Sequence, residues 1–563
     1  MKNKLLFSLS LLAIVSLVGC ATTSLKGEKS TDSSSSISTD EIAGGTSDVE
    51  IVEDTISSDF SLKNSSGTAI SETNGVYTIS AAGEYTAQGK LTGQILVNAA
   101  NKDVTLTLNG VSITNSSVSP IYVQDCNDFD LKVTNNTNNY LYDNRTTDYS
   151  TSDSTDGKGA IHVENGDLKI KGKGILSIES VANSGIHGKD NVSIKNVTML
   201  IKAVNNGIRG NDKITIEENP TLGIVAGNNG LVTHNSDKGS NAQHGYIYIK
   251  GGTITINSYG DAIDAAYAVE ISEGTDSEEN VYKPVLDLYT NIYSSYELTG
   301  SSKNLNAGRP GPGGPGGFGG DGWSGGKSAE KADDSAKGIK ANEAINISGG
   351  TIYSYTYDDG IHTNATKLDT GVTSSADINI SGGTLKIKAS DDGVHADKNL
   401  NITGGVVYVA ESHEGVEANI INIKGGELTV FGDDDGINAS SQINISGGRV
   451  DVTVSPNGDT DGIDSNGNIT ITGGAVIARG PNSDMAAPID ADGTIKIAGG
   501  TTIVVGYANA RFTTSNVTKT SSSNGLSTGD HTVTVDGATI TYSNTYTYSG
   551  AVTVYGSGSA TVK

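Results

Sequence analysis

One phrase recurs six times between Ala344 and Gly500, and this repeat limits the chain to a stacked architecture. Each copy has INISGGT or a close variant, a few alternating residues, and an acidic turn followed by an apolar anchor residue. The six anchors are Ile361, Val394, Val416, Ile437, Ile463 and Ile489, at steps of 33, 22, 21, 26 and 26 residues. Degenerate copies continue backwards through Ile339, Ile263, Leu231, Ile208, Ile186 and Ile161. Periods of this size predict a solenoid.

The repeat unit is predicted to consist of strands. Apolar and polar residues alternate within each copy, which is the period of a β-strand and not of a helix. Leu385, Ile387 and Ala389 are expected to face a core, with Lys386 and Lys388 on the opposite face. The paired glycines are expected to turn corners between strands, where no Cβ fits. The repeat therefore predicts an all-β fold, a parallel β-helix.

The N-terminus has the pattern of a lipoprotein signal. Residues 1–19 carry two early lysines and an apolar stretch, and they end in Leu-Val-Gly before Cys20, which is a lipobox. Cleavage there would leave Cys20 lipidated. Residues 20–50 are serine-rich and poor in apolar side chains, so we expect a flexible tether. These features predict an extracytoplasmic protein, lipid-anchored to the bacterial cell membrane or surface and touching the membrane only through that anchor.

The remainder is predicted to form one long domain and a cap. Residues 51–500 are expected to be the β-helix, begun by an N-terminal cap whose strands alternate from Gly75 onwards. A Gly/Pro-rich segment at about 299–336 reads as a flexible insertion, because it cannot pack a core. Residues 501–563 are expected to be a β-rich C-terminal cap that closes the far end.

The acidic turns are the first candidate site. Because each copy occupies the same place in its coil, the turn carboxylates should form a ladder along one edge. Two unit charges about 5 Å apart repel by about 3 to 4 kcal/mol at an effective dielectric of 20, so such a ladder needs cations. Oxygen-rich clusters suit Ca²⁺. The predicted calcium ligands are Asp358, Asp359, Asp391, Asp392, Glu414, Asp434, Asp435, Asp461 and Asp464. The alternative is that stacked Asx side chains satisfy turn amides without a metal.

The outward faces of the strands carry a second candidate site. If Ile352 and Leu385 point inward, then Tyr353, Lys386 and Tyr408 fall in one outward row, with Tyr355 beside them. Aromatic rows on a rigid sheet can stack against sugar rings, and lysine can meet uronate carboxylates. The alternative is that exposed tyrosines only support the sheet.

Several motifs in a fixed order carry a resemblance that spans Gly75 to Gly500. They are GVYTISAAGEYTAQGKLTGQILVNAANKDVTLTLNGVSITNSSVSPIYV, then GIHGKDNVSI and GIRGNDKITI, then AKGIKANEAINISGGTIYSYTYDDGIHTN. In this order they resemble the clostridial carbohydrate-binding family of polysaccharide-lyase-like β-helix proteins. The resemblance implies a calcium-containing, right-handed parallel β-helix at the bacterial surface that binds plant-wall polysaccharides such as cellulose and pectic acids.

The main alternative is a Ca²⁺-dependent pectate-lyase type of enzyme. Elimination from a uronate needs a lysine or arginine of lowered pKa to accept the proton. The candidates are Arg209 and Lys340, each one residue after an anchor. A carboxylate ladder beside them is expected to raise their pKa values and make them poor bases.

The sequence therefore favours a monomeric surface lipoprotein that binds cellulose, acidic pectic glycans or both without catalysis. A surface adhesin or structural protein is the third possibility. The formal net charge of −26 argues against nucleic acid as a partner.

Overall fold

The computed structural model describes residues 56–145, 158–236, 244–290, 335–508 and 511–563, and every regular element within these ranges is a β-strand. None of the described residues forms a helix long and apolar enough to cross a membrane. The predicted signal peptide, Cys20, the tether and residues 299–334 of the predicted insertion lie outside the described residues.

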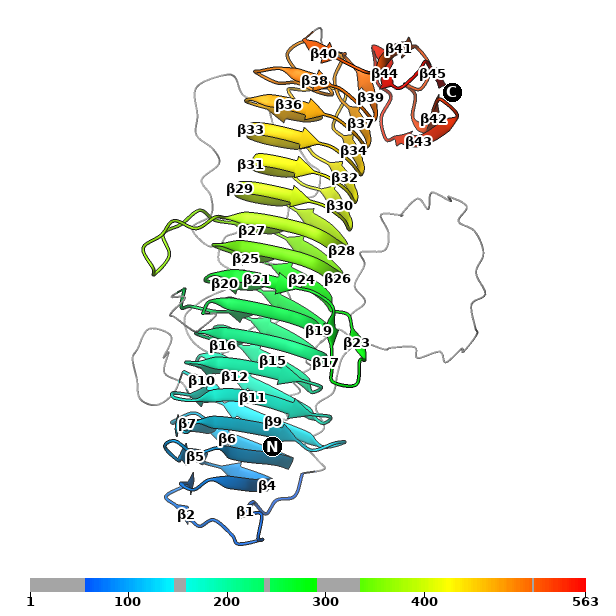
Figure 1. Ribbon diagram of the computed structural model, residues 1–563. Helices are drawn as coiled ribbons and strands as arrows, with labels where there is room; N and C mark the ends of the chain where they lie inside the picture. The colour runs from blue at the N-terminus through cyan, green and yellow to red at the C-terminus, as the bar shows by residue number, and fades with distance from the viewer. Residues whose placement is uncertain (1–55, 146–157, 237–243, 291–334, 509–510) are drawn as a thin grey trace, which may run out of the picture. The chain divides into compact units, whose positions relative to one another are not determined.

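The anchor residues lie in the first of three rows of parallel strands (Figure 1). Ile161, Ile186 and Ile208 pair in register, and the pairing continues through every later anchor to Ile489. The repeat register read from the sequence is therefore confirmed. The strands of this row are β5 (Gln94–Asn98), β7 (Ile121–Asp125), β10 (Gly159–Val163), β13 (Ser184–Gly188), β16 (Ile208–Gly210), β18 (Leu231–Val232), β20 (Ile263–Ala265), β25 (Ile339–Ala341), β27 (Ile361–Thr363), β29 (Val394–Ile402), β31 (Val416–Ile423), β33 (Ile437–Ile445) and β35 (Ile463–Ser465).

The second row contains the INIS segments. Its strands are β4 (Gly83–Thr92), β6 (Val104–Asn115), β8 (Asp128–Val133), β11 (Asp167–Gly172), β14 (Asn191–Lys195), β17 (Lys213–Ala226), β19 (Tyr246–Ser258), β21 (Ala268–Ile271), β26 (Ala344–Thr356), β28 (Asp377–Ala389), the later halves of β29, β31 and β33, and then β36 (Asn468–Ile471), β38 (Ile495–Ile497) and β40 (Phe512–Thr514).

The third row contains the strand segments that come after the position of the glycine pair in the sequence. It contains β9 (Asn138–Asp143), β12 (Ile175–Ser180), β15 (Thr198–Ala203), the later halves of β17 and β19, β24 (Val285–Thr290), the later halves of β26 and β28, and then β30 (Val406–Glu411), β32 (Glu427–Phe431), β34 (Arg449–Thr453), β37 (Ala475–Arg479) and β39 (Thr501–Gly506).

The inward side chains of all three rows form one hydrophobic core. It runs without a break from Leu62 to Tyr555, and the anchors Ile361, Val416 and Ile437 are fully buried in it. Burial of apolar surface at about 25 cal/mol per Å² is the main stabilising contribution. The expected inward set Leu385, Ile387 and Ala389 is confirmed as buried.

The predicted fold class, an open right-handed parallel β-helix, is corrected by the strand pairing. Forty strands belong to one continuous hydrogen-bonded sheet that closes around the single core, instead of separate sheets that meet at glycine corners. The long strands β19, β26 and β28 pass through their glycine pairs without interruption. Antiparallel strands join the same sheet at both ends. The protein is all-β, as predicted, with one closed and mainly parallel sheet.

The ends of the sheet differ from its middle. At the N-terminal end β1 (Ser61–Asn64) pairs antiparallel with β4, and β2 (Glu72–Thr73) with β3 (Val76–Ile79). Parallel pairing continues past the predicted boundary at residue 500, through β39 and β40. Beyond it β44 (Ala551–Gly556) pairs antiparallel with β39 and with β41 (Thr518–Ser522). The strands β42 (Gly529–Val535), β43 (Ala538–Asn544) and β45 (Ala560–Val562) form a separate antiparallel sheet. The strands β22 (Gly274–Thr275) and β23 (Val281–Tyr282) form a small hairpin that is a two-stranded sheet of its own.

An amide ladder lies on the outward side of the second row. The Nδ2 atom of Asn379 donates to Oδ1 of Asn346 at 2.8 Å, and the same bond recurs from Asn401, Asn422 and Asn444 to the preceding copy at 2.9, 3.0 and 3.0 Å. Asn346 in turn donates to Glu270 Oε1 at 2.7 Å. The recurring asparagine of INIS is thus explained by contacts between copies.

Two kinds of glycine are required by this geometry. The second glycine of each pair has a left-handed backbone, as at Gly426 with φ of 78°, which explains why glycine is needed there. The predicted corner between two strands is found in the later copies, whereas β19, β26 and β28 continue through their glycine pairs. The glycine that precedes most anchors instead lies against the next copy, while Ile161 and Ile263 follow an alanine and Ile489 follows a proline. A Cβ on Gly415 would lie 1.9 Å from Val430 Cγ1 and 2.4 Å from the Gly436 carbonyl oxygen.

Gly415→Ala is therefore expected to destabilise the protein by about 3 kcal/mol or more, because neither the backbone oxygen nor the packed valine can retreat. Thermal melting followed by circular dichroism measures this. The control is Gly67→Ala, where φ is 79° but no atom lies within 4 Å of the added Cβ. Strain alone should cost about 1 kcal/mol there. Equal effects of the two changes would contradict the steric explanation.

Candidate metal and carbohydrate sites

The residue two positions before each anchor forms a column, which we call the turn column. Its members are Asn206, Asn229, Asp261, Lys337, Asp359, Asp392, Glu414, Asp435 and Asp461. Side chains of this column accept hydrogen bonds from the backbone of the next copy. The Asp392 amide donates to Asp359 Oδ1 at 3.0 Å, and the Asp461 amide donates to Asp435 Oδ1 at 2.8 Å. The turn carboxylates are therefore aligned, and they also satisfy turn amides, as the metal-free alternative requires.

The residue immediately after each anchor forms a second column, the strand column. Its members, paired in register, are His162, His187, Arg209, Val232, Asp264, Lys340, His362, His395, Glu417, Asn438 and Asp464. The two columns touch, because His395 Nδ1 lies 2.8 Å from Asp392 Oδ2. Charges of the two columns therefore act on one another.

Lysines neutralise the columns near their middle. Lys337 Nζ lies 2.6 Å from Asp358 Oδ2 and 2.7 Å from Asp359 Oδ2. Although burial opposes ionisation, the hydrogen bond from His362 and the Lys337 charge hold the pKa of Asp359 well below its usual range. The predicted calcium ligands Asp358 and Asp359 thus already have a cation, and the sequence analysis overlooked Lys337.

The later part of the columns has no such compensation. Burial and neighbouring carboxylates raise the pKa of Glu414 to about 8 and the pKa of Asp461 to about 7. The same two causes raise the pKa values of Asp435 and Asp464 to about 6. Within the described part of the chain, neither lysine nor arginine forms an ion pair with any of these four residues. We call these four carboxylates the acidic group.

A buried amide oxygen belongs to Asn438, which lies beside Glu414 of the acidic group. Asn438 Oδ1 is shielded from solvent and has no hydrogen-bond partner, while its Nδ2 lies 3.2 and 3.3 Å from the two Glu414 oxygens. An orphaned carbonyl oxygen is rare. Carboxylates and an amide oxygen are ligand types that Ca²⁺ accepts. The described side chains whose ligand atoms lie within 4.8 Å of one another are found earlier in the columns, as Asp359 with His362 and His395, Asp392 with His395 and Glu417, and Asp358 with Asp359 and Asp391.

The remaining predicted metal ligands lie one residue ahead of the turn column. Asp391 lies with Asp358 and Asp359 in a group whose ligand atoms are within 4.8 Å of one another. The Asp434 side chain is partly exposed, and its Oδ2 lies 3.8 Å from His413 Nε2. Water therefore screens the charge of Asp434 more than the charges of the buried Asp359 and Asp392.

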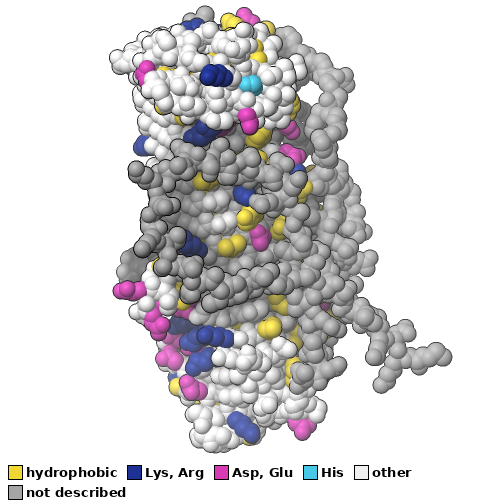
Figure 2. Space-filling view, turned by 90° about the vertical axis from the view of Figure 1, so that its right-hand side faces the viewer, with side chains coloured by type: hydrophobic (Ala, Val, Ile, Leu, Met, Phe, Trp, Pro, Cys, Tyr) yellow, Lys and Arg dark blue, Asp and Glu magenta, His cyan; other side chains and the backbone are white. Residues whose placement is uncertain are grey.

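The charges at the N-terminal end of the sheet are arranged differently. Figure 2 shows basic and acidic side chains gathered together toward that end. In β8 and β11 such charges pair across strands, with Lys169 Nζ 2.8 Å from Asp128 and Lys171 Nζ 2.6 Å from Asp130. The charges of these two strands are therefore compensated by ion pairs, unlike those of the acidic group.

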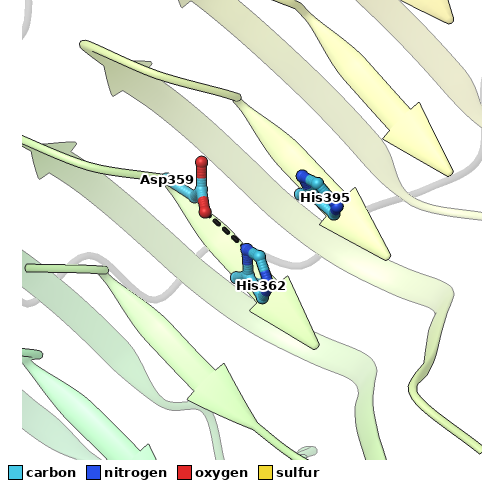
Figure 3. A group of neighbouring side chains, drawn as sticks. All are labelled: Asp359, His362 and His395. Atoms are coloured by element: carbon cyan, nitrogen blue, oxygen red, sulfur yellow. Dashed lines mark hydrogen bonds and ion pairs between the residues drawn. The ribbon is translucent and has the colours of Figure 1, made fainter. Parts of the chain in front are cut away.

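Two histidines of the strand column, His362 and His395, contact the turn-column carboxylates Asp359 and Asp392. The sequence analysis did not name either of them. His362 Nδ1 lies 2.5 Å from Asp359 Oδ2, and Figure 3 shows this contact with His395 on the neighbouring strand. The two imidazole rings stack with centroids 4.4 Å apart. A signal was present, because GIHTN and GVHAD place histidine one residue after consecutive anchors.

The predicted carbohydrate row is aligned as the repeat requires. Tyr353 pairs with Lys386 and Lys386 with Tyr408 on the outward side of the third row. Lys386 Nζ lies 5.4 Å from the Tyr353 ring centroid, and Lys388 Nζ lies 5.6 Å from that of Tyr355. All of these side chains are half-buried. The row is compatible with sugar stacking and equally with support of the sheet through cation–π contacts.

The two candidate lyase bases differ from each other. Lys340 Nζ lies 3.3 Å from Asp261 and 3.9 Å from Asp264, and despite burial these carboxylates raise its pKa. Arg209 donates from Nε to Asn211 at 2.8 Å, and burial lowers its pKa. The expectation that carboxylates raise both pKa values is thus correct for Lys340 and wrong for Arg209, which lies beside histidines instead.

Comparison with known proteins assigns the chain to a family. A model of the family described as carbohydrate-binding domain-containing protein matches residues 73–371, 365–415 and 417–550. A protein of that description from Acetivibrio thermocellus is 31% identical over 273 residues, covering 48% of this chain and 88% of that protein. A solved structure of a polysaccharide lyase-like protein from C. thermocellum, a gadolinium derivative, is 28% identical. It covers 39% of this chain and 85% of its own, with a TM-score of 0.35. By its family match, this chain is a member of the carbohydrate-binding domain-containing proteins.

Proposed function

We propose that the protein binds plant-wall polysaccharide without catalysis, at the outward side of the third row. The observation that carries this proposal is the alignment of Tyr353, Lys386 and Tyr408 on consecutive strands. A row of rings on a rigid sheet offers stacking surfaces at a fixed repeat, and the ammonium group offers a partner for uronate carboxylates. Cellulose, acidic pectic glycans or both are the proposed ligands. The family description supports the class of ligand.

Replacing both tyrosines tests this proposal. Tyr353→Ala with Tyr408→Ala should weaken retention on cellulose or in pectin affinity gels by about tenfold, which corresponds to about 1.4 kcal/mol for the lost stacking. The control is Tyr546→Ala, an exposed tyrosine outside the row. Retention equal to that of the unaltered protein, at an unchanged melting temperature, would rule the row out as the binding surface.

We further propose that Ca²⁺ occupies the acidic group and stabilises the fold. Support comes from its four unpaired carboxylates and the orphaned Asn438 oxygen. Asp358 and Asp359 are weaker candidates, because Lys337 supplies their cation. Surface localisation through a lipidated Cys20 remains part of the proposal and rests on the lipobox alone.

A polysaccharide lyase is the second candidate, and one observation favours it. Burial lowers the pKa of Arg209, which is the property that a base for uronate elimination needs. Incubation with polygalacturonate and Ca²⁺ should then yield unsaturated products, and Arg209→Gln, which removes the base, should abolish them. Absence of such products from the unaltered protein would leave the non-catalytic binder.

A further inference from the structure

We propose that Asp392, His395 and Glu417 form a site for a transition-metal ion of the zinc class, separate from the proposed calcium group. Two consecutive copies of the stack supply these residues. Asp392 lies in the turn before β29, His395 lies on β29, and Glu417 lies beside His395 on the paired strand β31.

The three side chains converge on one point. His395 Nδ1 lies 2.8 Å from Asp392 Oδ2 and 2.9 Å from Glu417 Oε2, and the three ligand atoms are all within 4.8 Å of one another. Bonds of about 2.0 to 2.2 Å at right or tetrahedral angles put neighbouring ligand atoms about 2.9 to 3.4 Å apart. The two distances from Nδ1 already match this spacing, so an ion would take the place of the Nδ1 proton between the two carboxylates.

The other ring nitrogen of His395 has the partner that a metal-bound histidine needs. Nε2 lies 3.4 Å from Asp397 Oδ1, and Asp397 is itself held because its Oδ2 accepts from the Ala365 amide at 2.6 Å. A carboxylate on the far nitrogen fixes the tautomer that leaves Nδ1 free to coordinate, and it increases the basicity of the ring. Asp397 is not one of the three ligands, so this contact is a separate observation that supports the site.

The backbone holds the site in position. The Asp392 amide donates to Asp359 Oδ1 at 3.0 Å, and His395 and Glu417 are partners in the strand ladder. The Asp392 side chain is 8% exposed and the His395 side chain 17%. Bonds from a rigid, largely buried set avoid the entropy of ordering mobile ligands.

The charges around the site favour a cation. Although burial opposes ionisation, hydrogen bonds to Asp392, Asp397 and Glu417 raise the pKa of His395 to about 12, so without a metal the protonated imidazole supplies the positive charge that an ion would replace. Within the described residues no lysine or arginine forms an ion pair with Asp392 or Glu417. The neighbouring Asp359–His362 pair differs, since Lys337 already contacts Asp359. The imidazole nitrogen selects the class of ion, because Ca²⁺ takes oxygen ligands whereas zinc-class ions accept nitrogen.

The test is a titration of the full-length protein with Zn²⁺ after chelator treatment, in millimolar Ca²⁺, with Co²⁺ absorption as a second readout. We expect one ion to bind despite the Ca²⁺. His395→Gln should remove the nitrogen ligand and weaken Zn²⁺ binding by about a hundredfold or more, and Asp397→Asn should weaken it by about ten- to a hundredfold. His413→Gln, an exposed histidine near Asp434, is the matched control and should change nothing.

Two results would overturn the proposal. One is Zn²⁺ affinity that is the same in His395→Gln and the unaltered protein, and the other is displacement of Zn²⁺ by equimolar Ca²⁺, which would assign the ion to oxygen ligands. If His395→Gln fails to fold, Asp397→Asn decides, because it leaves the three ligands in place. Neither result depends on polysaccharide binding or on the calcium proposal.

Discussion

Removing Ca²⁺ with EDTA is expected to lower the melting temperature on the order of 10 °C at pH 8 and much less at pH 5. The reason is that protons and Ca²⁺ compete to relieve the acidic group. At pH 8 the carboxylates of Asp435, Asp461 and Asp464 are ionised and repel one another in the metal-free protein. At pH 5 they hold protons, because burial and like charges raise their pKa values to about 6 or about 7.

The sign follows from proton binding. Folded carboxylates with pKa values of about 6 to 8 hold protons that the same groups in the unfolded chain, with ordinary pKa values, have already lost. Between these pH limits the folded state binds more protons, so the free energy of unfolding falls as pH rises. Each extra bound proton contributes about 1.4 kcal/mol per pH unit. The metal-free protein should therefore become steadily less stable from pH 5 to pH 8.

Calorimetry with and without Ca²⁺ across this pH range makes the measurement. Asp461→Asn should raise the metal-free melting temperature at pH 8, since the amide oxygen can still accept from the Ala487 backbone while the charge is gone. Asp530→Asn, an exposed aspartate in β42, is the control and should have little effect. Identical melting curves with Ca²⁺ and with EDTA at pH 8 would refute calcium binding by this group.

Arg479→Met is expected to cost about 3 to 5 kcal/mol and to release the C-terminal strands at a lower temperature than the rest. The Arg479 side chain is 1% exposed, and its Nη1 lies 2.5 Å from Asp451 Oδ1. It also donates to Val452 O at 3.1 Å and, from Nε, to Asn544 Oδ1 at 3.0 Å, with its guanidinium 5.4 Å from the Tyr542 ring centroid. Arg479 therefore ties β43 to β34 and β37.

The matched control is Arg449→Met. Arg449 contacts the same carboxylate at 2.6 Å and also donates to the Thr541 carbonyl oxygen of β43 at 2.9 Å, but its side chain is 33% exposed, so its loss should cost about 1 kcal/mol or less. Hydrogen exchange of β42 to β45 measures where the protein opens. If both arginine changes destabilise equally, or if exchange in these strands is unaltered by Arg479→Met, the proposed tie is wrong.

The stacking register could be predicted from the sequence because each copy repeats the same pattern of glycine, apolar and polar residues. An apolar residue follows a glycine that admits no Cβ, and alternation then fixes which side chains face the core. The alignment of Tyr353 with Lys386 follows from that register without further information. Two earlier copies, at Ile95 and Ile121, were missed because their turns lack the acidic phrase that marks the later ones.

The contacts that decide the sites could not be read in this way. Lys337 neutralises Asp358 and Asp359 from an adjacent copy whose own turn reads SAKG and has no acid. Closure of the sheet, with strands running through the glycine corners, depends on bond geometry that periodicity does not record. Arg479 pairs with residues far along the chain, and such long-range contacts leave no local pattern.

The amide ladder of the second row gives the stack a direction. Each asparagine donates an N–H to the copy before it, and Glu270 accepts the bond from Asn346. All except Asn444 also accept a bond from the copy after them, whereas Asn444 accepts from Gln442 on its own strand. A copy removed cleanly reconnects its two neighbours, whereas a partial deletion strands a donor on one side and an acceptor on the other. The protein is therefore suited to lengthen or shorten in whole repeats, and the number of outward-facing rings can change without redesign of the core.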